Sequence, residues 1–381
     1  MVSRATRTLE HQVVIAGGGP AGSTAAAALA SAGISVVVLE KRRSTGDKPC
    51  AGGILRRTMR IMPKALASCA KWQDEIRKFY LSCGSSEGFE RSTRGPLAYT
   101  VLRTEFDKLL AEHAERSGAQ VLRGQCVERV EVDAGLVVAE TRDLRVRARV
   151  LIGADGAGSL VARQFDMVRR LDLEPAFVMR VAPPAMGPWR GRVAIDWDAP
   201  AGGYSWVFPK ADHLSAGAVG QASTCEELRK RTRGILAACV GTAPKEMSES
   251  FGCVPLGTSD LDRARERVLL VGDAASLVDP FTREGLSWAF WSAQLAAKAA
   301  TAFLGGRTRS LLSYEALLEE ELLPELRAAA EVAEWFYSDP LSAHRMLRDS
   351  PLVWHAFCRV LTGRISYRAL LRKLPSLASR G

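Results

Sequence analysis

Apolar runs of two kinds alternate along the first part of the chain. Residues 11–16 form a short β-branched run typical of a buried central strand, and the Ala-rich residues 23–32 follow with a helical pattern. Further buried strands are predicted at 34–39 and 150–153. Strands that alternate with helices favour a parallel sheet, so the pattern predicts an α/β, Rossmann-like fold.

The pattern changes in the middle of the chain and at its end. Residues 193–197 and 204–208 alternate in the manner of half-buried antiparallel strands, and 224–240 follow as a helix. Residues 311–337 read as one long helix, and prolines then interrupt shorter helices at Pro340, Pro351 and Pro375. This pattern predicts a mixed, largely antiparallel sheet followed by a helical region.

The turn after the first strand has the spacing GxGxxG, with Gly17, Gly19, Ala21 and Gly22 in it. Such glycines permit a tight turn, close approach of a pyrophosphate and close packing of helix on strand. The amides at the start of the helix favour the pyrophosphate charge. Glu40 ends the second strand 18 residues after Gly22, where an acid accepts ribose hydroxyls and disfavours a 2′-phosphate.

Residues 268–285 form a second informative stretch. A buried strand is followed by Asp273, a loop that contains Pro280, and a long apolar helix that opens at Gly285-Leu286. This order places a carboxylate and a helix N-terminus around one polar ligand. Together with the glycine-rich turn it indicates a bound flavin dinucleotide. The helix contains Gln294 and Lys298, so we interpret it as a buried helix and not as a membrane span.

Three motifs together resemble those of FAD-dependent oxidoreductases of the aromatic-hydroxylase type: GxGxxG, Asp155-Gly156 and Gly272-Asp273. This resemblance implies FAD as cofactor, with Asp155 in an indirect role that overlaps with turn formation. It also implies four direct contacts with the cofactor. Arg103 would contact the pyrophosphate or the flavin, and Asp273 would bind the ribityl or pyrophosphate region. The backbone of Val127 would contact the adenine, and the amides of Gly285 and Leu286 would face the isoalloxazine.

Two further segments are similar to the geranylgeranyl reductase family. They are Cys50-Ala51-Gly52-Gly53 and Tyr204-Ser-Trp206-Val-Phe208-Pro209, and they accompany the Asp279-Pro280 to Gly285 loop. In that family the Cys-x-Gly-Gly loop packs beside the flavin, and the aromatic strand lines the substrate cavity. The resemblance implies an FAD-binding domain at 1–80, 96–170 and 254–305. A substrate domain would occupy 171–253 with 81–95, and a helical region 306–381.

The resemblance implies reduction of C=C bonds in a prenyl lipid or quinone tail by hydride transfer from reduced flavin. The second alkene carbon then needs a proton, for which Cys50 and Tyr204 are candidates. Cys50 could equally be a small packing residue, whereas Trp206 and Tyr204 could line the cavity or belong to a core. Lys48 would raise the positive potential near the reduced flavin.

Other functions remain open on the same scaffold. A monooxygenase would use the same cofactor, and a halogenase would be expected to carry Trp-x-Trp-x-Ile-Pro, from which the Tyr204 to Pro209 segment departs. A flavin-binding redox sensor or lipid carrier is a non-enzymatic alternative. No second complete GxGxxG unit is present, so NAD(P)H would dock transiently or a small redox protein would deliver the electrons.

Charge and cysteine usage limit the partners. The chain carries a formal charge of +10, and residues 341–381 hold eight basic residues against one acid, which is 8 − 1 = +7. No nucleic-acid module accompanies them, so they indicate a membrane surface or a solvated helical face. The 8 cysteines form no CxxC pair or metal-ligand spacing, and we predict no metal site. A first strand near Val13 leaves no room for a secretory signal, which favours the cytoplasm or a peripheral position at the inner face of the membrane.

Overall fold

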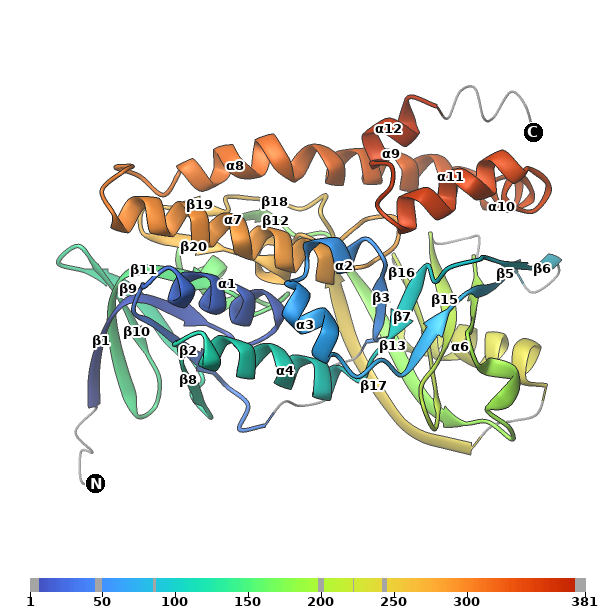
Figure 1. Ribbon diagram of the computed structural model, residues 1–381, viewed down its shortest axis with the longest axis horizontal. Helices are drawn as coiled ribbons and strands as arrows, with labels where there is room; N and C mark the ends of the chain where they lie inside the picture. The colour runs from blue at the N-terminus through green and yellow to red at the C-terminus, as the bar shows by residue number, and fades with distance from the viewer. Residues whose placement is uncertain are drawn as a thin grey trace. The chain divides into compact units, whose positions relative to one another are not determined.

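The computed structural model of the protein describes residues 7–44, 50–84, 87–197, 202–221, 223–241 and 245–373 (Figure 1). The chain forms two compact units, each built from three separated segments. Unit 1 comprises 1–46, 107–172 and 255–326, and unit 2 comprises 47–106, 173–254 and 327–381. The three domains inferred from the sequence remain a prediction; in this division residues 306–381 are shared between the two units.

Unit 1 is built on a sheet whose centre is parallel. The strand order is β19 (Ala264–Arg265), β20 (Val268–Leu270), β11 (Leu144–Gly153), β1 (Arg7–Ala16), β2 (Val36–Glu40), β8 (Gln120–Arg123). Strand β1 pairs in parallel with β2 on one side and β11 on the other, and Val13, Val14 and Ile15 of β1 are fully buried. Two antiparallel strands, β10 (Leu136–Glu140) and β9 (Arg129–Asp133), extend from β11. The predicted Rossmann-like α/β fold is confirmed.

Two helices of unit 1 pack side by side, α1 (Pro20–Ser31) and α7 (Leu286–Leu304) (Figure 1). Both are rich in buried alanine, and small side chains allow helices to approach closely. Helix α1 begins three residues before the predicted start, because Pro20 suits the first helical position. Helix α4 (Arg103–Arg116) begins in unit 2 and continues in unit 1. The other elements of unit 1 are α5 (Leu160–Gln164), the 3₁₀ turn η3 (Gly272–Ala275), α8 (Ser313–Glu321), and the strand pair β12 (Val168–Arg170) and β18 (Asp260–Leu261).

Unit 2 contains a seven-stranded mixed sheet. The strand order is β17 (Lys245–Pro255), β13 (Leu173–Ala182), β16 (Leu214–Gly220), β15 (Gly203–Pro209), β14 (Arg192–Asp196), β5 (Lys78–Cys83), β6 (Glu87–Ser92). The pairs β13–β16, β16–β15, β15–β14 and β5–β6 are antiparallel, whereas β14 and β5 are parallel. A small sheet joins β3 (Gly53–Leu55), β7 (Ala98–Thr100) and β4 (Asp74–Ile76), and α2 (Thr58–Ile61), α3 (Lys64–Cys69) and η1 (Gly187–Trp189) complete this part. The predicted mixed sheet is confirmed.

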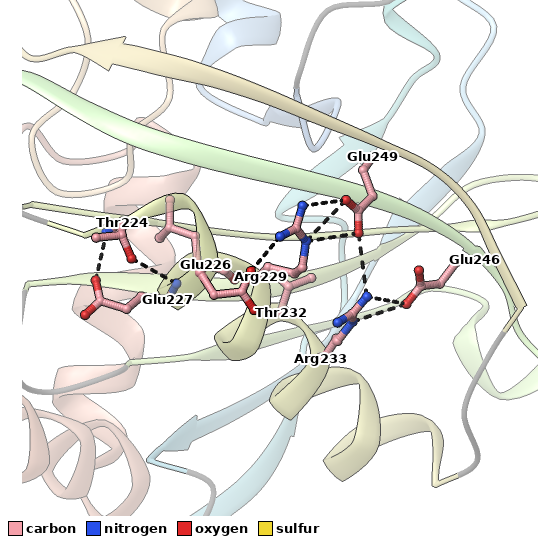
Figure 2. Close-up of polar contacts among 9 residues, drawn as sticks. Thr224, Glu226, Glu227, Arg229, Thr232, Arg233, Glu246 and Glu249 are labelled. Carbon is pink, nitrogen blue, oxygen red and sulfur yellow. Dashed lines mark hydrogen bonds and ion pairs between the residues drawn. The ribbon is translucent and has the colours of Figure 1, made fainter.

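Helix α6 (Cys225–Val240) covers one face of this sheet with Leu228, Ile235 and Leu236. Thr224 and Glu227 form a capping box at its start. Figure 2 shows the polar side of the helix, where arginines bridge to glutamates of the edge strand β17. The bridges join Arg229 to Glu226 and Glu249, and Arg233 to Glu246 and Glu249. Exposed ion pairs contribute little, so the apolar face of α6 holds the helix in place.

The carboxyl-terminal helices correct one prediction. The single helix predicted over 311–337 is interrupted at Leu322, between α8 and α9 (Leu323–Ser338). Pro324 follows the interruption, and its lack of an N–H removes the hydrogen bond that would continue the helix. The helices α10 (Pro340–Asp349) and α11 (Pro351–Leu361) begin at the predicted prolines, and α12 (Tyr367–Leu371) follows. Pro375 lies outside the described residues. Over the stretches that the structure describes, no helix has the length and apolar character needed to cross a membrane.

Candidate cofactor and substrate sites

The glycine-rich turn of unit 1 accepts no side chain at two of its positions. Gly17 has φ +104°, and a Cβ there would lie 2.3 Å from the carbonyl oxygen of Ala154. A Cβ on Gly22 would lie 1.9 Å from the carbonyl oxygen of Gly17. Gly19 is the residue before α1, and this helix starts with no side-chain cap. The buried first turn, which includes Ala21, therefore offers backbone amides to an anion.

Glu40 reaches the same turn from the end of β2. Its Oε2 accepts a hydrogen bond from the Gly18 amide at 2.6 Å, and its Oε1 accepts one from the Arg42 amide at 2.9 Å. Each carboxylate oxygen has a second lone pair with which it can accept from a ribose hydroxyl. Val127 is half-buried in the link from β8 to β9, and β8 is the neighbour of β2. These residues fit the adenosine and pyrophosphate parts of FAD.

Asp155 has a local structural task. Its carboxylate accepts hydrogen bonds from the Ser159 hydroxyl at 2.6 Å and from the amides of Leu160 and Val161 at 2.7 and 3.2 Å. These bonds cap α5 and shape the turn, and Gly156 in that turn has φ +89°. The indirect role that we predict for Asp155 is consistent with these contacts.

Asp273 and the start of α7 lie together. A Cβ on Gly285 would stand 3.3 Å from Oδ1 of Asp273, so the carboxylate is next to the residue that precedes Leu286 and the helix. The loop between them is built around buried Asp279, whose Oδ1 accepts from the amides of Phe281 and Thr282 at 2.8 and 2.9 Å. This arrangement fits a flavin end that needs backbone donors beside a carboxylate.

Sequence reasoning missed two organisers of this loop as site residues. Asp279 forms the turn just described, directly before buried Pro280. Glu284 accepts a hydrogen bond from the Ser287 amide at 2.8 Å and so caps α7. An Asp before Pro and a Glu shortly before a helix are recognised turn and cap signals, and they could have identified both residues.

Hydrogen bonds to backbone and side-chain atoms hold the Cys50–Gly53 loop of unit 2 in place. The half-buried Cys50 accepts at Sγ from the Gly52 amide at 3.3 Å and from Nη1 of Arg103 at 3.5 Å. Gly52 has φ +64°, and its carbonyl accepts from the Val101 amide at 2.9 Å. The predicted residues Cys50, Ala51, Gly52 and Arg103 are therefore neighbours. Lys48 lies outside the described residues.

A buried lysine that sequence reasoning did not select also contacts this loop. Nζ of Lys210 donates to the carbonyls of Ala51 at 2.7 Å and Gly52 at 3.3 Å. The residue is 3% exposed, and this burial lowers the pKa of its ammonium group to about 7. Its position directly after the Phe-Pro of the aromatic strand is the signal that could have identified it.

The aromatic strand β15 belongs to a cluster of rings in unit 2. The ring of Tyr204 lies 5.8 Å from Trp197 and 5.9 Å from Trp206, and Trp197 lies 4.8 Å from Phe336 of α9. Trp206 is buried against apolar side chains of the sheet, and Ala51 packs on the same cluster. The structure thus brings the loop that follows Cys50 to the wall that contains Tyr204 and Trp206.

The comparisons with known proteins agree with these features. Residues 10–188 match the FAD binding domain family. Digeranylgeranylglycerophospholipid reductase 1 of Methanopyrus kandleri is 32% identical over 86% of this chain and 90% of its own length. Geranylgeranyl diphosphate reductase of Rhodobacter capsulatus is 30% identical over 78% and 76%.

Among solved structures, a geranylgeranyl bacteriochlorophyll reductase-like protein of Thermoplasma acidophilum has a TM-score of 0.81 at 22% identity, covering 97% of this chain and 100% of that one. At this identity the likeness supports the fold. The match to the Methanopyrus reductase covers most of both chains, and the family resemblance of the motifs is confirmed. The chain belongs to the geranylgeranyl reductase family of FAD-dependent oxidoreductases.

Proposed function

We propose that this protein reduces C=C bonds of a prenyl chain in a lipid or quinone tail. The names of its relatives, a digeranylgeranylglycerophospholipid reductase and a geranylgeranyl diphosphate reductase, support this substrate class. The observation that carries the proposal is the aromatic cluster of Trp197, Tyr204, Trp206 and Phe336. Ala51 of the Cys50–Gly53 loop packs against the core around Trp206. Large rings offer a long apolar chain extensive contact area.

Unit 1 would hold the cofactor by its backbone and two carboxylates. The Gly17 to Gly22 turn and the α1 amides would bind the pyrophosphate, and Glu40 the ribose hydroxyls. Asp273 would bind the ribityl or pyrophosphate region. Pro280 and the amides of Gly285 and Leu286 would meet the flavin ring, and the backbone of Val127 the adenine. When bound and reduced, FAD supplies the hydride that the alkene accepts.

Unit 2 would supply the proton and the substrate wall. Saturation of one C=C bond needs one hydride and one proton, and we assign the proton to the thiol of Cys50, which becomes a thiolate as the second C–H bond forms. Arg103, whose guanidinium contacts that sulfur, stabilises the negative charge until the thiol is protonated again from solvent. Tyr204 is the alternative donor, through its hydroxyl, and Trp206 would line the cavity.

The electron donor and the membrane contact complete the proposal. NAD(P)H would dock transiently, or a small redox protein would reduce the flavin. A peripheral membrane contact is supported by exposed apolar residues on α10 and α11, Leu341 at 36% and Leu352 at 54%. Exposed basic residues accompany them on and after α11: Arg359, Arg364, Arg368, Arg372 and Lys373. Such a surface suits anionic headgroups.

The test is mass spectrometry of a prenyl-lipid extract incubated without oxygen with the purified, dithionite-reduced protein. A gain of two hydrogens per reduced bond is the expected result. A gain of one oxygen, seen only after air is admitted, would identify a monooxygenase instead. Incorporation of a halogen from added bromide, seen only after air is admitted, would identify a halogenase, and the absence of turnover with every donor would favour a redox sensor or carrier.

A further inference from the structure

Lys210 lies at the turn that joins the aromatic strand β15 to β16. Its backbone amide donates to the carbonyl of His213 at 2.8 Å and closes a four-residue hairpin turn. Its side chain is buried within unit 2, where Nζ donates to the consecutive carbonyls of Ala51 and Gly52, in a loop about 160 residues earlier in the chain. The lysine therefore connects the aromatic strand to the Cys50–Gly53 loop.

The fit around this ammonium group is close. A Cβ on Gly52 would lie 2.7 Å from Nζ and 2.4 Å from the carbonyl oxygen of Val101. A Cβ on Gly53 would lie 2.6 Å from the ring of Phe208. The consecutive glycines therefore leave the room that the lysine and the phenylalanine occupy, and the loop is held against the strand end at every residue from Ala51 to Gly53.

Burial has the largest effect on the Lys210 ammonium group and lowers its pKa, a charge on Cys50 raises this pKa, and Arg180 of β13 lowers it. In the turn itself, Asp212 pairs with Nδ1 of His213 at 2.7 Å. A buried lysine is costly unless its donors are satisfied, so a purely structural purpose would be met more simply by an apolar residue.

We propose that Lys210 is a positioning residue that clamps the Cys50–Gly53 loop to the end of the aromatic strand through the carbonyls of Ala51 and Gly52. The inference rests on the proposed function in so far as Cys50 serves the reaction. The clamp keeps the thiol and Arg103 in place beside the aromatic wall.

The test follows the alkylation of Cys50 by iodoacetamide at one fixed pH, resolved from the other cysteines by peptide mass spectrometry. Cys50 is half-buried in a loop that hydrogen bonds hold closed, so the reagent reaches its sulfur more often when the loop opens. In Lys210→Met, which loses both hydrogen bonds to the loop carbonyls, we expect the alkylation rate to be about tenfold higher than in the wild type.

Three variants complete the design. Lys210→Arg keeps N–H donors at this position, so we expect the loop to stay closed and Cys50 to be alkylated at the wild-type rate. Hydrogen exchange reports closure: the Gly52 and Val101 amides should exchange about tenfold faster in Lys210→Met, as for the loss of one net hydrogen bond, and unchanged in Lys210→Arg. Lys78→Met removes an exposed lysine of the same unit and should match the wild type.

An unchanged Cys50 alkylation rate in Lys210→Met, with unchanged hydrogen exchange, would overturn the proposal. If Lys210→Met does not fold, Lys210→Gln replaces it, because its shorter side chain lacks the reach to both carbonyls. Neither measurement uses the prenyl substrate. Failure of the proposed function would appear as no saturated product while the loop of Lys210→Met still opens more often.

Discussion

The buried ammonium group of Lys210 makes a quantitative prediction about stability. Its pKa falls from 10.5 to about 7 in the folded protein, chiefly because burial disfavours the charge. Below pH 7 the residue is charged in both states and contributes no pH dependence. Between pH 7 and 10.5 the unfolded chain binds a proton that the folded protein does not, so the stability of the folded protein rises with pH. Above pH 10.5 both states are neutral and the contribution levels off.

The magnitude follows from the size of this pKa difference. A difference of about 3.5 units corresponds to about 5 kcal/mol over the whole window, or about 1.4 kcal/mol for each pH unit. Lys210→Met removes this pH dependence. The free energy of unfolding of the wild type, relative to that of the variant, should therefore rise by about 3 kcal/mol between pH 7 and pH 9. Every other titrating group is common to both proteins and cancels in the difference.

The assay is urea unfolding of wild type and Lys210→Met at pH 6, 7, 8 and 9, followed by tryptophan fluorescence. The difference in unfolding free energy should stay level from pH 6 to 7 and then rise in favour of the wild type. Lys78→Met, which removes an exposed lysine, should give a level difference throughout. A difference between wild type and Lys210→Met that stays constant or falls above pH 7 would refute the claim that burial dominates at this site.

Three further predictions concern the cofactor, the proton and the membrane. Gly22→Ala should abolish stoichiometric FAD binding, measured by flavin absorbance per protein, because its Cβ would lie 1.9 Å from a carbonyl oxygen; Gly234→Ala, with open space around it, should bind FAD normally. Cys50→Ala should lower the rate of prenyl saturation by about 10²- to 10⁴-fold at unchanged flavin content. An unchanged rate would identify Tyr204, and not Cys50, as the proton donor. Leu352→Asp should weaken binding to anionic vesicles in a sedimentation assay, whereas Leu312→Asp, equally exposed in unit 1, should leave it unaltered; equal effects would contradict a specific contact.

Local sequence signals determined a large part of the fold and of the cofactor site. The β-branched run ending at Ala16, the glycines after it and the Pro-containing loop before α7 each act within a few residues of one another. Turn chemistry and periodicity are short-range properties, so the sequence alone is enough to predict them. The same reasoning failed at Leu322, where Pro324 interrupts an apolar pattern that otherwise continues.

Only the tertiary structure decided which distant residues meet. Glu40 accepts from the Gly18 amide because β2 lies beside β1 in the parallel sheet, and Trp197 reaches Phe336 across 139 residues of sequence (336 − 197). Lys210 looks like an ordinary surface lysine in the sequence. Its role as a clamp arises because the β15–β16 turn is folded against two glycines of a loop in another segment, which removes its ammonium group from water. Burial depends on the order of strands and on packing across the unit, and no local pattern encodes either.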